Sequence, residues 1–287
     1  MSQVQPPPRK FAWPPRPIAP EPSPRAEPKR ERSRAAGSSL DFDPGPPSRG
    51  WWHTVEAAWL GLARPPLVVR AAQAGWAPDP PEAYCPRCGG DAGSFEVDDL
   101  GCMACRDQDV PWSRAIRLGA YEGVLRDMIL DVKYTAWRAL GVDLGRLLGA
   151  VAAATLEQAG VPLAKVVLVP VPSTFWRRMA RGVNHASAIA QGAGEVLGAP
   201  VVSVLTRRHR PTQVSVAPSK RAANVRNTMR RTSIDLAGRT VVLVDDVRTT
   251  GATLAEACRA LRYGSTESRP ASILAATLAV TPTPSPR

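Results

Sequence analysis

The segment Thr240-Val-Val-Leu-Val-Asp-Asp-Val-Arg-Thr-Thr-Gly-Ala-Thr253 contains the strongest indication of the fold. Its first five residues form an apolar, mostly β-branched run that is typical of a buried strand. The run ends at two adjacent carboxylates, Asp245 and Asp246, and a hydroxyl-rich stretch then leads into a helix expected over residues 254–262. Ligands of open α/β sheets bind at the carboxyl ends of strands. The segment therefore predicts a ligand site where strand and helix meet.

The residue types of this turn suit a sugar phosphate. A helix N-terminus offers unpaired backbone N–H groups, which favour a phosphate. Neighbouring carboxylates can accept hydrogen bonds from two ribose hydroxyls, directly or through hydrated Mg²⁺. An ordinary turn with capping residues is the alternative, but packing does not explain adjacent acids after an apolar strand. The expected site consists of Asp245 and Asp246 for the ribose, and Thr249, Thr250, Gly251, Ala252 and Thr253 for the phosphate.

Residues 241–253 resemble the signature with which type I phosphoribosyltransferases bind phosphoribosyl pyrophosphate (PRPP). In that family the two acids contact the ribose, and the threonine-glycine turn binds the 5′-phosphate. The resemblance implies an α/β protein of the type I phosphoribosyltransferase fold, with a central, mostly parallel sheet. It also implies that Mg²⁺ binds together with PRPP.

The hydrophobic pattern outside this segment agrees with an α/β fold. Strands that alternate with helices indicate a parallel sheet. Two helices, at 123–140 and 142–159, are expected before the first strand. The remaining expected elements are a strand at 166–171, a helix at 184–197, and strands at 201–205, 240–244 and 272–280.

Four cysteines form two C-x2-C pairs before this region. The pairs Cys85/Cys88 and Cys102/Cys105 are separated by 13 residues, a spacing that lets two knuckles meet around a tetrahedral zinc. Redox-active dithiols, or a cluster without metal, are the alternative. Four cysteine ligands would leave no open position for water or substrate, so we expect a structural zinc rather than a catalytic one.

Basic residues are concentrated in the middle of the chain. Residues 158–234 contain 12 Lys or Arg and a single acid, Glu195. Arginine forks with Mg²⁺ suit a pyrophosphate leaving group. Nucleic-acid binding would use the same residue types, and a solvated basic face is the plainest alternative. The expected basic residues of the PRPP site are Arg177, Arg178 and Arg181 after one strand, and Lys220 and Arg221 in a later loop.

The order of these motifs narrows the resemblance. A zinc ribbon, a helix with Lys133-Tyr134, Val-Pro-Val-Pro172 with its arginines, Lys220-Arg221-Ala-Ala-Asn224 and the acidic pair follow one another. The chain is thereby similar, over residues 83–280, to the ComF family of zinc-ribbon, phosphoribosyltransferase-like proteins. The resemblance implies that the first basic loop faces pyrophosphate and the later one closes over the site. It also implies a link with DNA uptake in competence.

The composition sets the limits of this interpretation. Residues 1–50 are expected to be a disordered, Pro-rich tail, since 13 of the 30 prolines lie before residue 50. We expect an amphipathic helix and linker at 51–82, the zinc ribbon at 83–112 and the phosphoribosyltransferase-like domain at 113–287.

A net charge of +12 favours a polyanionic partner. The sequence contains neither a continuous apolar span nor a secretory signal, so it predicts a cytoplasmic protein without membrane contact, and an oligomer is compatible with it.

Three functions fit these features. The first is transfer of a phosphoribosyl group from Mg²⁺-bound PRPP to a nitrogen acceptor that the sequence does not identify. The second is a non-enzymatic module that contacts single-stranded DNA or a DNA-processing protein. The third is a regulator that binds PRPP, or another ribose 5-phosphate, without turnover.

Overall fold

The computed structural model describes residues 66–93, 95–134, 138–173, 184–207, 227–263 and 268–282. The chain divides into two units, Met1–Val68 and Val69–Arg287, and nearly all described residues belong to the second. The predicted disordered tail at 1–50 lies outside the described residues, as does most of the helix predicted after residue 50. A short helix, α2 (Leu67–Gln73), begins after Pro66.

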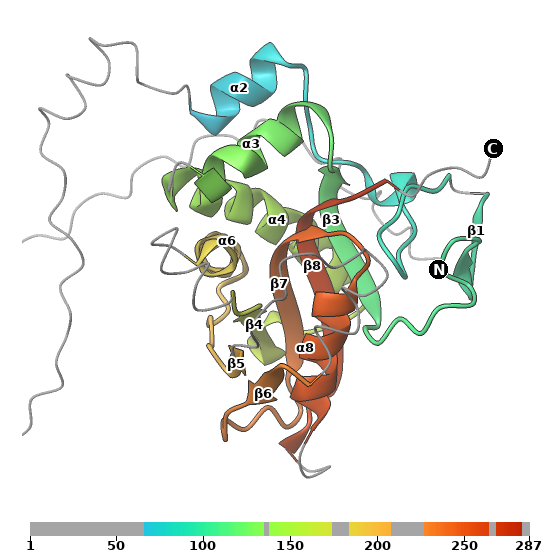
Figure 1. The fold of residues 1–287 in the computed structure, drawn as a ribbon, viewed down its shortest axis with the longest axis vertical. Coiled ribbons are helices and arrows are strands. Elements are labelled where there is room, and N and C mark those ends of the chain that lie inside the picture. Colours follow the sequence, from blue (N-terminus) through green and yellow to red (C-terminus); the bar gives the residue numbers. More distant parts are fainter. Residues whose placement is uncertain are drawn as a thin grey trace, which may run out of the picture. The chain divides into compact units, whose positions relative to one another are not determined.

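The core of the second unit is a four-stranded parallel sheet of order β3-β8-β7-β4, as Figure 1 shows. The strands are β3 (Arg114–Ala120), β4 (Val166–Pro170), β7 (Thr240–Arg248) and β8 (Ser272–Val280). Their apolar runs are buried on both faces, as expected for parallel strands with helices on each side. The predicted α/β class with a parallel central sheet is confirmed.

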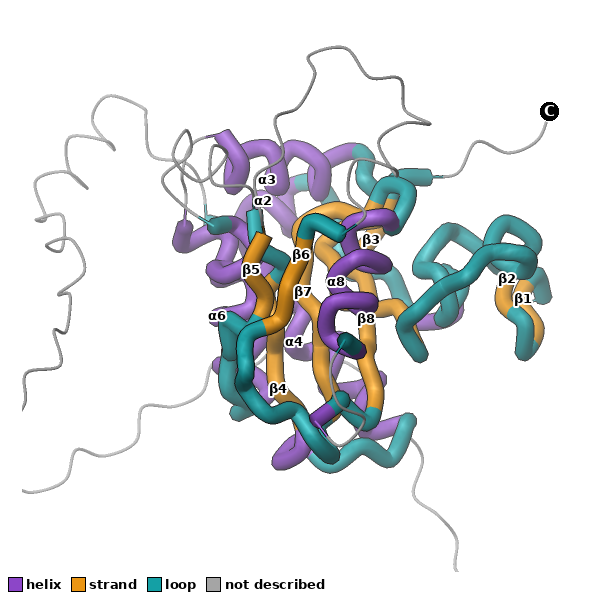
Figure 2. The backbone as a smooth tube through the Cα atoms, turned by 60° about the horizontal axis from the view of Figure 1, so that its bottom comes forward, coloured by secondary structure: helices purple, strands orange, loops and turns teal. Residues whose placement is uncertain are grey.

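Helices cover both faces of this sheet. In Figure 2, α8 (Ala252–Arg262) lies in front of β7 and β8, while α4 (Arg138–Gln158) lies behind them. The core on the α8 side joins Leu254, Ala257 and Leu261 to Val241 and Leu243 of β7. On the other side, α4 packs with α6 (His185–Leu197), and α3 (Gly123–Tyr134) precedes α4.

Glycines allow α4 and α6 to approach until their backbones touch. A Cβ atom at Gly192 would lie 1.9 Å from the carbonyl oxygen of Val142, and one at Gly145 would lie 2.1 Å from that of Ile189. Neither neighbour is a side chain that can rotate away. Any side chain at these positions must therefore push the helices apart.

We expect Gly192→Ala to lower the free energy of unfolding by about 2 to 4 kcal/mol, because the added methyl group overpacks a backbone contact. Urea unfolding would measure the change. Gln191→Ala, at an exposed neighbour on α6, should change it by less than about 0.5 kcal/mol. Equal values for the two variants would contradict the close approach.

Several predicted boundaries need correction. The helix predicted at 123–140 ends as α3 at Tyr134, and α4 begins at Arg138. The strand predicted at 201–205 is reduced to a single bridge at Val201, and β5 (Leu205–Arg207) pairs instead with β6 (Met229–Arg231), which the sequence did not suggest. Strand β3 was also missed. The strand predicted at 272–280 matches β8.

Helix α4 is the one helix in the described residues that is long and apolar enough to pass as a membrane span. More than half of its apolar window is buried inside the fold, and a core helix gives the same signal. Its packing against α6 accounts for its apolar composition.

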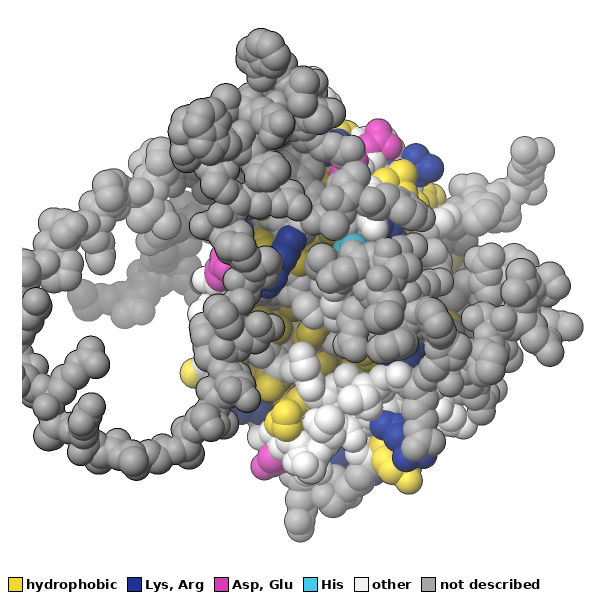
Figure 3. Space-filling view, turned by 60° about the vertical axis from the view of Figure 1, so that its left-hand side comes forward, with side chains coloured by type: hydrophobic (Ala, Val, Ile, Leu, Met, Phe, Trp, Pro, Cys, Tyr) yellow, Lys and Arg dark blue, Asp and Glu magenta, His cyan; other side chains and the backbone are white. Residues whose placement is uncertain are grey.

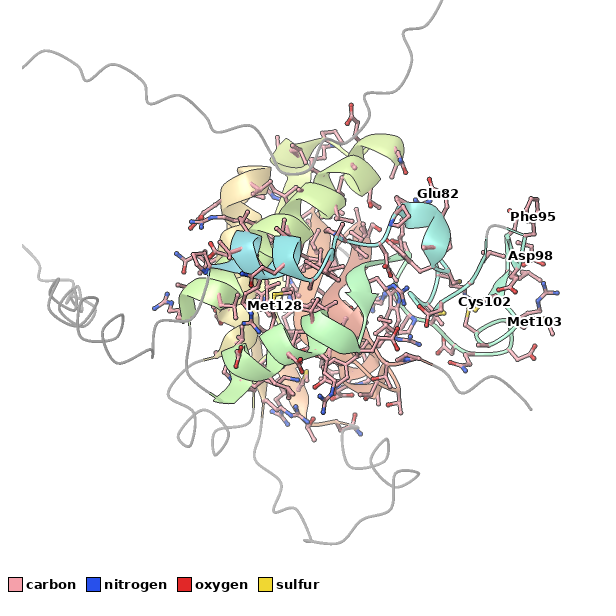
Figure 4. All side chains as sticks on the ribbon, turned by 90° about the horizontal axis from the view of Figure 1, so that it is seen from above. Glu82, Phe95, Asp98, Cys102, Met103 and Met128 are labelled. Carbon is pink, nitrogen blue, oxygen red and sulfur yellow. The ribbon has the colours of Figure 1, made fainter. Side chains whose placement is uncertain are left out.

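The cysteine-rich segment is small and made largely of turns. It contains a 3-10 turn (Pro81–Ala83) and the two short antiparallel strands β1 (Val97–Asp98) and β2 (Gly101–Cys102). Figure 4 labels Phe95, Asp98 and Met103 at its outer end, and the side chains of Phe95 and Met103 are almost fully exposed. We call residues 83–112 the ribbon.

The ribbon is fastened to β3 by a buried arginine. Arg117 is 1% exposed, and its guanidinium donates hydrogen bonds to Asp79 (2.6 Å), Asp91 (2.6 Å) and the carbonyl oxygen of Gly89 (2.9 Å). It also lies 5.0 Å from the ring centroid of Tyr84. One strand residue thus holds three points of the preceding segment.

Candidate functional site

The acidic pair lies just beyond the point where the edge strand β4 ends. Strand β7 continues to Arg248, so Asp245 and Asp246 lie within it and not beyond its end, which corrects the sequence expectation. Strand β4, however, stops at Pro170, opposite Val244. The two carboxylates therefore follow the last residue of β7 that pairs with β4. This early end of β4 leaves room for a ligand beside them.

A cavity of about 380 Å³ occupies that room. It brings together both predicted acids and two of the predicted threonines. It also collects residues from several parts of the chain that are distant in sequence, as expected at the carboxyl edge of a parallel sheet. The lining residues are Tyr121, Lys133, Val171, Pro172, Ser173, Asn184, His185, Ala186, Arg207, Asp245, Asp246, Val247, Thr249 and Thr253.

Charges of both signs meet in this cavity. Lys133 Nζ lies 3.2 Å from a carboxylate oxygen of Asp246 and 5.7 Å from the ring centroid of Tyr121. Burial, reinforced by the neighbouring charge of Asp246, raises the pKa of Asp245 to about 7, while Lys133 and Arg207 oppose the shift. One carboxyl group of the pair, that of Asp245, therefore titrates near neutrality, and the cationic side chains of Lys133 and Arg207 line the same cavity.

The turn after β7 depends on a glycine. Gly251 has φ of 76°, in the left-handed region that disfavours side chains, and it is the N-cap of α8. The amide of Ala252 donates a long hydrogen bond of 3.4 Å to Thr250 Oγ1. Thr249 and Thr253 face the cavity, whereas Thr250, Gly251 and Ala252 do not line it.

Several cavity residues were not predicted from the sequence. Lys133 lay in a predicted helix and Arg207 in a basic cluster, but neither was assigned to the site, and Tyr121 gave no signal at all. The predicted Arg177, Arg178, Arg181, Lys220 and Arg221 lie outside the described residues. Their assignment to the PRPP site stays a prediction.

The four predicted cysteine ligands form one buried cluster. Their sulfur atoms all lie within 4.8 Å of one another. The Sγ–Sγ distances are 3.8 Å for Cys85–Cys105, 3.7 Å for Cys88–Cys102 and 3.8 Å for Cys102–Cys105. Zinc–sulfur bonds of about 2.3 Å at tetrahedral angles would place sulfur atoms roughly 3.8 Å apart. The cluster can hold a metal ion, and its geometry is compatible with zinc.

Comparison with known proteins agrees with this architecture. Residues 153–283 match the phosphoribosyl transferase domain family. Together with the parallel sheet and the cavity beside β7, this match defines a protein with a phosphoribosyltransferase-type domain.

The relatives define the family more closely. The chain is 32% identical over 183 residues to DNA utilization protein YhgH of Salmonella typhi, covering 62% of this chain and 78% of that protein. It is 29% identical over 185 residues to Competence protein F of Haemophilus influenzae, with the same coverage. The chain belongs to the ComF family.

Among solved structures, an allosteric regulatory enzyme of purine biosynthesis overlaps 48% of this chain and 25% of its own chain. The identity is 20% and the TM-score 0.30.

Proposed function

We propose that the protein binds PRPP with Mg²⁺ in the cavity beside β7 and transfers the phosphoribosyl group to a nitrogen acceptor. The observation that supports this most is the convergence of Asp245, Asp246, Thr249 and Thr253 on one cavity. Carboxylates that can accept hydrogen bonds from a diol and threonine hydroxyls that can donate to a phosphate therefore line the same space, which suits a ribose 5-phosphate.

In this proposal, Asp245 and Asp246 accept hydrogen bonds from the ribose hydroxyls, and the turn holds the 5′-phosphate. The acceptor nitrogen forms a bond to C1 as the bond from C1 to the pyrophosphate oxygen breaks, and the acceptor loses a proton. Bound Mg²⁺ would neutralise charge on the pyrophosphate. The carboxylates also stabilise the positive character that develops on the ribose.

Lys133 and Arg207 are the cations of the described residues that line this cavity. We assign to Lys133 the role of holding Asp246 in place and of facing the ligand phosphates once they enter. The four cysteines are proposed to bind a structural zinc, since all four ligand positions are filled by protein.

Calorimetry with PRPP and Mg²⁺ tests the binding site. Wild type should release or take up heat on binding, and Asp245→Asn/Asp246→Asn should show none, because the variant loses the acceptors for the ribose diol. Asp127→Asn is a matched control, since Asp127 is 62% exposed on α3. Absence of heat in wild type would refute the proposal.

Turnover needs a separate assay. Pyrophosphate release against a panel of nucleobases and amines should identify an acceptor in wild type and fail in the double variant. Binding without release for every acceptor would instead identify a PRPP-binding regulator.

A second candidate function is contact with single-stranded DNA. A groove of about 950 Å³ beside α8 is lined by Arg259, Arg262 and Arg269 together with Tyr263, whose exposed fraction is 77%. Arginines next to an exposed aromatic ring suit phosphates and a stacked base. Arg259 forms an ion pair with Glu256 (2.8 Å), so part of its charge is already neutralised. On the face shown in Figure 3, the basic side chains of the described residues are scattered and do not form one patch. Salt-dependent DNA binding that Arg262→Gln/Tyr263→Ala weakens would favour this function.

A further inference from the structure

Trp112, the last residue of the ribbon, packs against the turn after β7. Its side chain is 6% exposed and belongs to the core cluster that includes Leu254 and Ala257 of α8. A Cβ atom at Gly251 would lie 3.2 Å from Cη2 of the Trp112 ring. The indole therefore packs directly against the glycine on which the shape of the turn depends.

The same indole is hydrogen-bonded to the segment that carries the first cysteine pair. Trp112 Nε1 donates a hydrogen bond of 2.8 Å to the carbonyl oxygen of Arg87. Arg87 lies between Cys85 and Cys88, so its carbonyl group is part of the first metal-binding knuckle. The position of the ring thus depends on the conformation of that knuckle.

Arg87 also connects the two cysteine pairs. Its guanidinium donates to the carbonyl oxygens of Leu100, of Arg106 (3.3 Å) and of Gln108 (2.9 Å), which lie on either side of the second pair. The main chain adds a further tie, because Ala115 N donates to Pro86 O at 2.7 Å. A metal ion that fixes both knuckles therefore fixes Arg87 and, through it, Trp112.

We propose that Trp112 is a positioning residue that couples metal binding at the four cysteines to the shape of the turn at residues 249–253. Because coupling between two sites is reciprocal, a ligand held by the turn also strengthens metal retention. The effect of a bound ligand on metal retention rests on the proposed function, whereas the effect of the metal on the turn does not.

Hydrogen exchange tests the effect of the metal on the turn without any ligand. Removal of zinc from the full chain by a chelator should increase deuterium uptake in residues 249–262 and leave α4 unchanged, because α4 lies on the opposite face of the sheet. Trp112→Phe removes both the N–H donor and the distal ring atom Cη2 that packs against Gly251, so it breaks the connection between the knuckle and the turn. In that variant, chelation should have little further effect on residues 249–262.

Two outcomes would overturn the coupling. One is unchanged uptake in residues 249–262 after zinc removal from wild type. The other is an equal rise in α4, which would indicate general unfolding and not transmission through Trp112. Trp76→Phe, an indole deletion in the segment between α2 and the ribbon, should behave as wild type.

The rate of zinc loss to a chromogenic chelator tests the effect of a bound ligand on metal retention. Saturating PRPP with Mg²⁺ should slow the loss about fivefold or more in wild type and in Trp76→Phe, and by less than about twofold in Trp112→Phe. If calorimetry shows PRPP binding but zinc loss is unaffected, the coupling is wrong and the proposed function stands. If PRPP does not bind, the proposed function fails, and hydrogen exchange still decides the coupling.

Discussion

Replacing Asp245 with Asn is expected to stabilise the ligand-free protein at pH 8 while abolishing PRPP binding. Burial and the neighbouring Asp246 raise the pKa of Asp245 to about 7, from an ordinary value of 3.8. Asn keeps an oxygen that can accept the 2.9 Å hydrogen bond from the Asp246 amide, but it carries no charge to bury. The variant therefore removes an unfavourable ionisation and, with it, the group proposed to hold the ribose.

The free energy of unfolding of wild type should depend on pH through the ionisation of Asp245. Between pH 4 and pH 7 the folded wild type keeps a proton that the unfolded chain has lost, so its stability falls as the pH rises through this window. Above pH 7 the folded carboxyl is also ionised, and the loss is complete. The advantage of Asp245→Asn should grow over this range, from near zero to on the order of 2 kcal/mol.

Urea unfolding at pH 4.5, 6 and 8 would measure the difference, and calorimetry with PRPP and Mg²⁺ would measure binding in the same samples. Asp235→Asn is a suitable control, because Asp235 is exposed and accepts a local hydrogen bond from Ala237. A stability difference that does not change with pH would contradict the buried ionisation. A loss of stability in Asp245→Asn at pH 8 would contradict it more strongly.

This part of the molecule could be predicted because its signals are local. The apolar run, the two acids and the hydroxyl-rich turn are contiguous, so the residues from Thr240 to Thr253 alone predict strand, turn and helix. The end of β7 was misplaced because the strand continues by pairing with β8, a partner distant in sequence. Local propensity carries no information about where a tertiary neighbour ends.

The residues that were missed share a different property, since their roles depend on contacts between distant segments. Lys133 belongs to the site through its ion pair with Asp246, and no spacing in the sequence relates the two. Strand β3 reads Arg-Ala-Ile-Arg-Leu-Gly-Ala, which has no clean alternation of polar and apolar residues. Its buried Arg117 is tolerated only because acids from the preceding segment reach it.

That dependence makes Arg117 the most sensitive position in the attachment of the ribbon. Arg117→Met is expected to lower the free energy of unfolding by about 3 kcal/mol, because Asp79, Asp91 and the carbonyl oxygen of Gly89 lose a common donor. Arg117→Lys should recover only part of this loss, since an ammonium group cannot reproduce the planar fork that serves three acceptors.

Arg114→Met, on the opposite face of β3, provides the matched control and should change stability by less than about 0.5 kcal/mol. A double-mutant cycle with Asp91→Asn would isolate the ion pair from the loss of packing against Tyr84. If Arg117→Met unfolds at the same urea concentration as Arg114→Met, the ribbon is held by its remaining contacts with β3, such as the hydrogen bond from Ala115 to Pro86. The expected large difference would instead place most of the attachment on one guanidinium group, whose partners are brought together only by the folded chain.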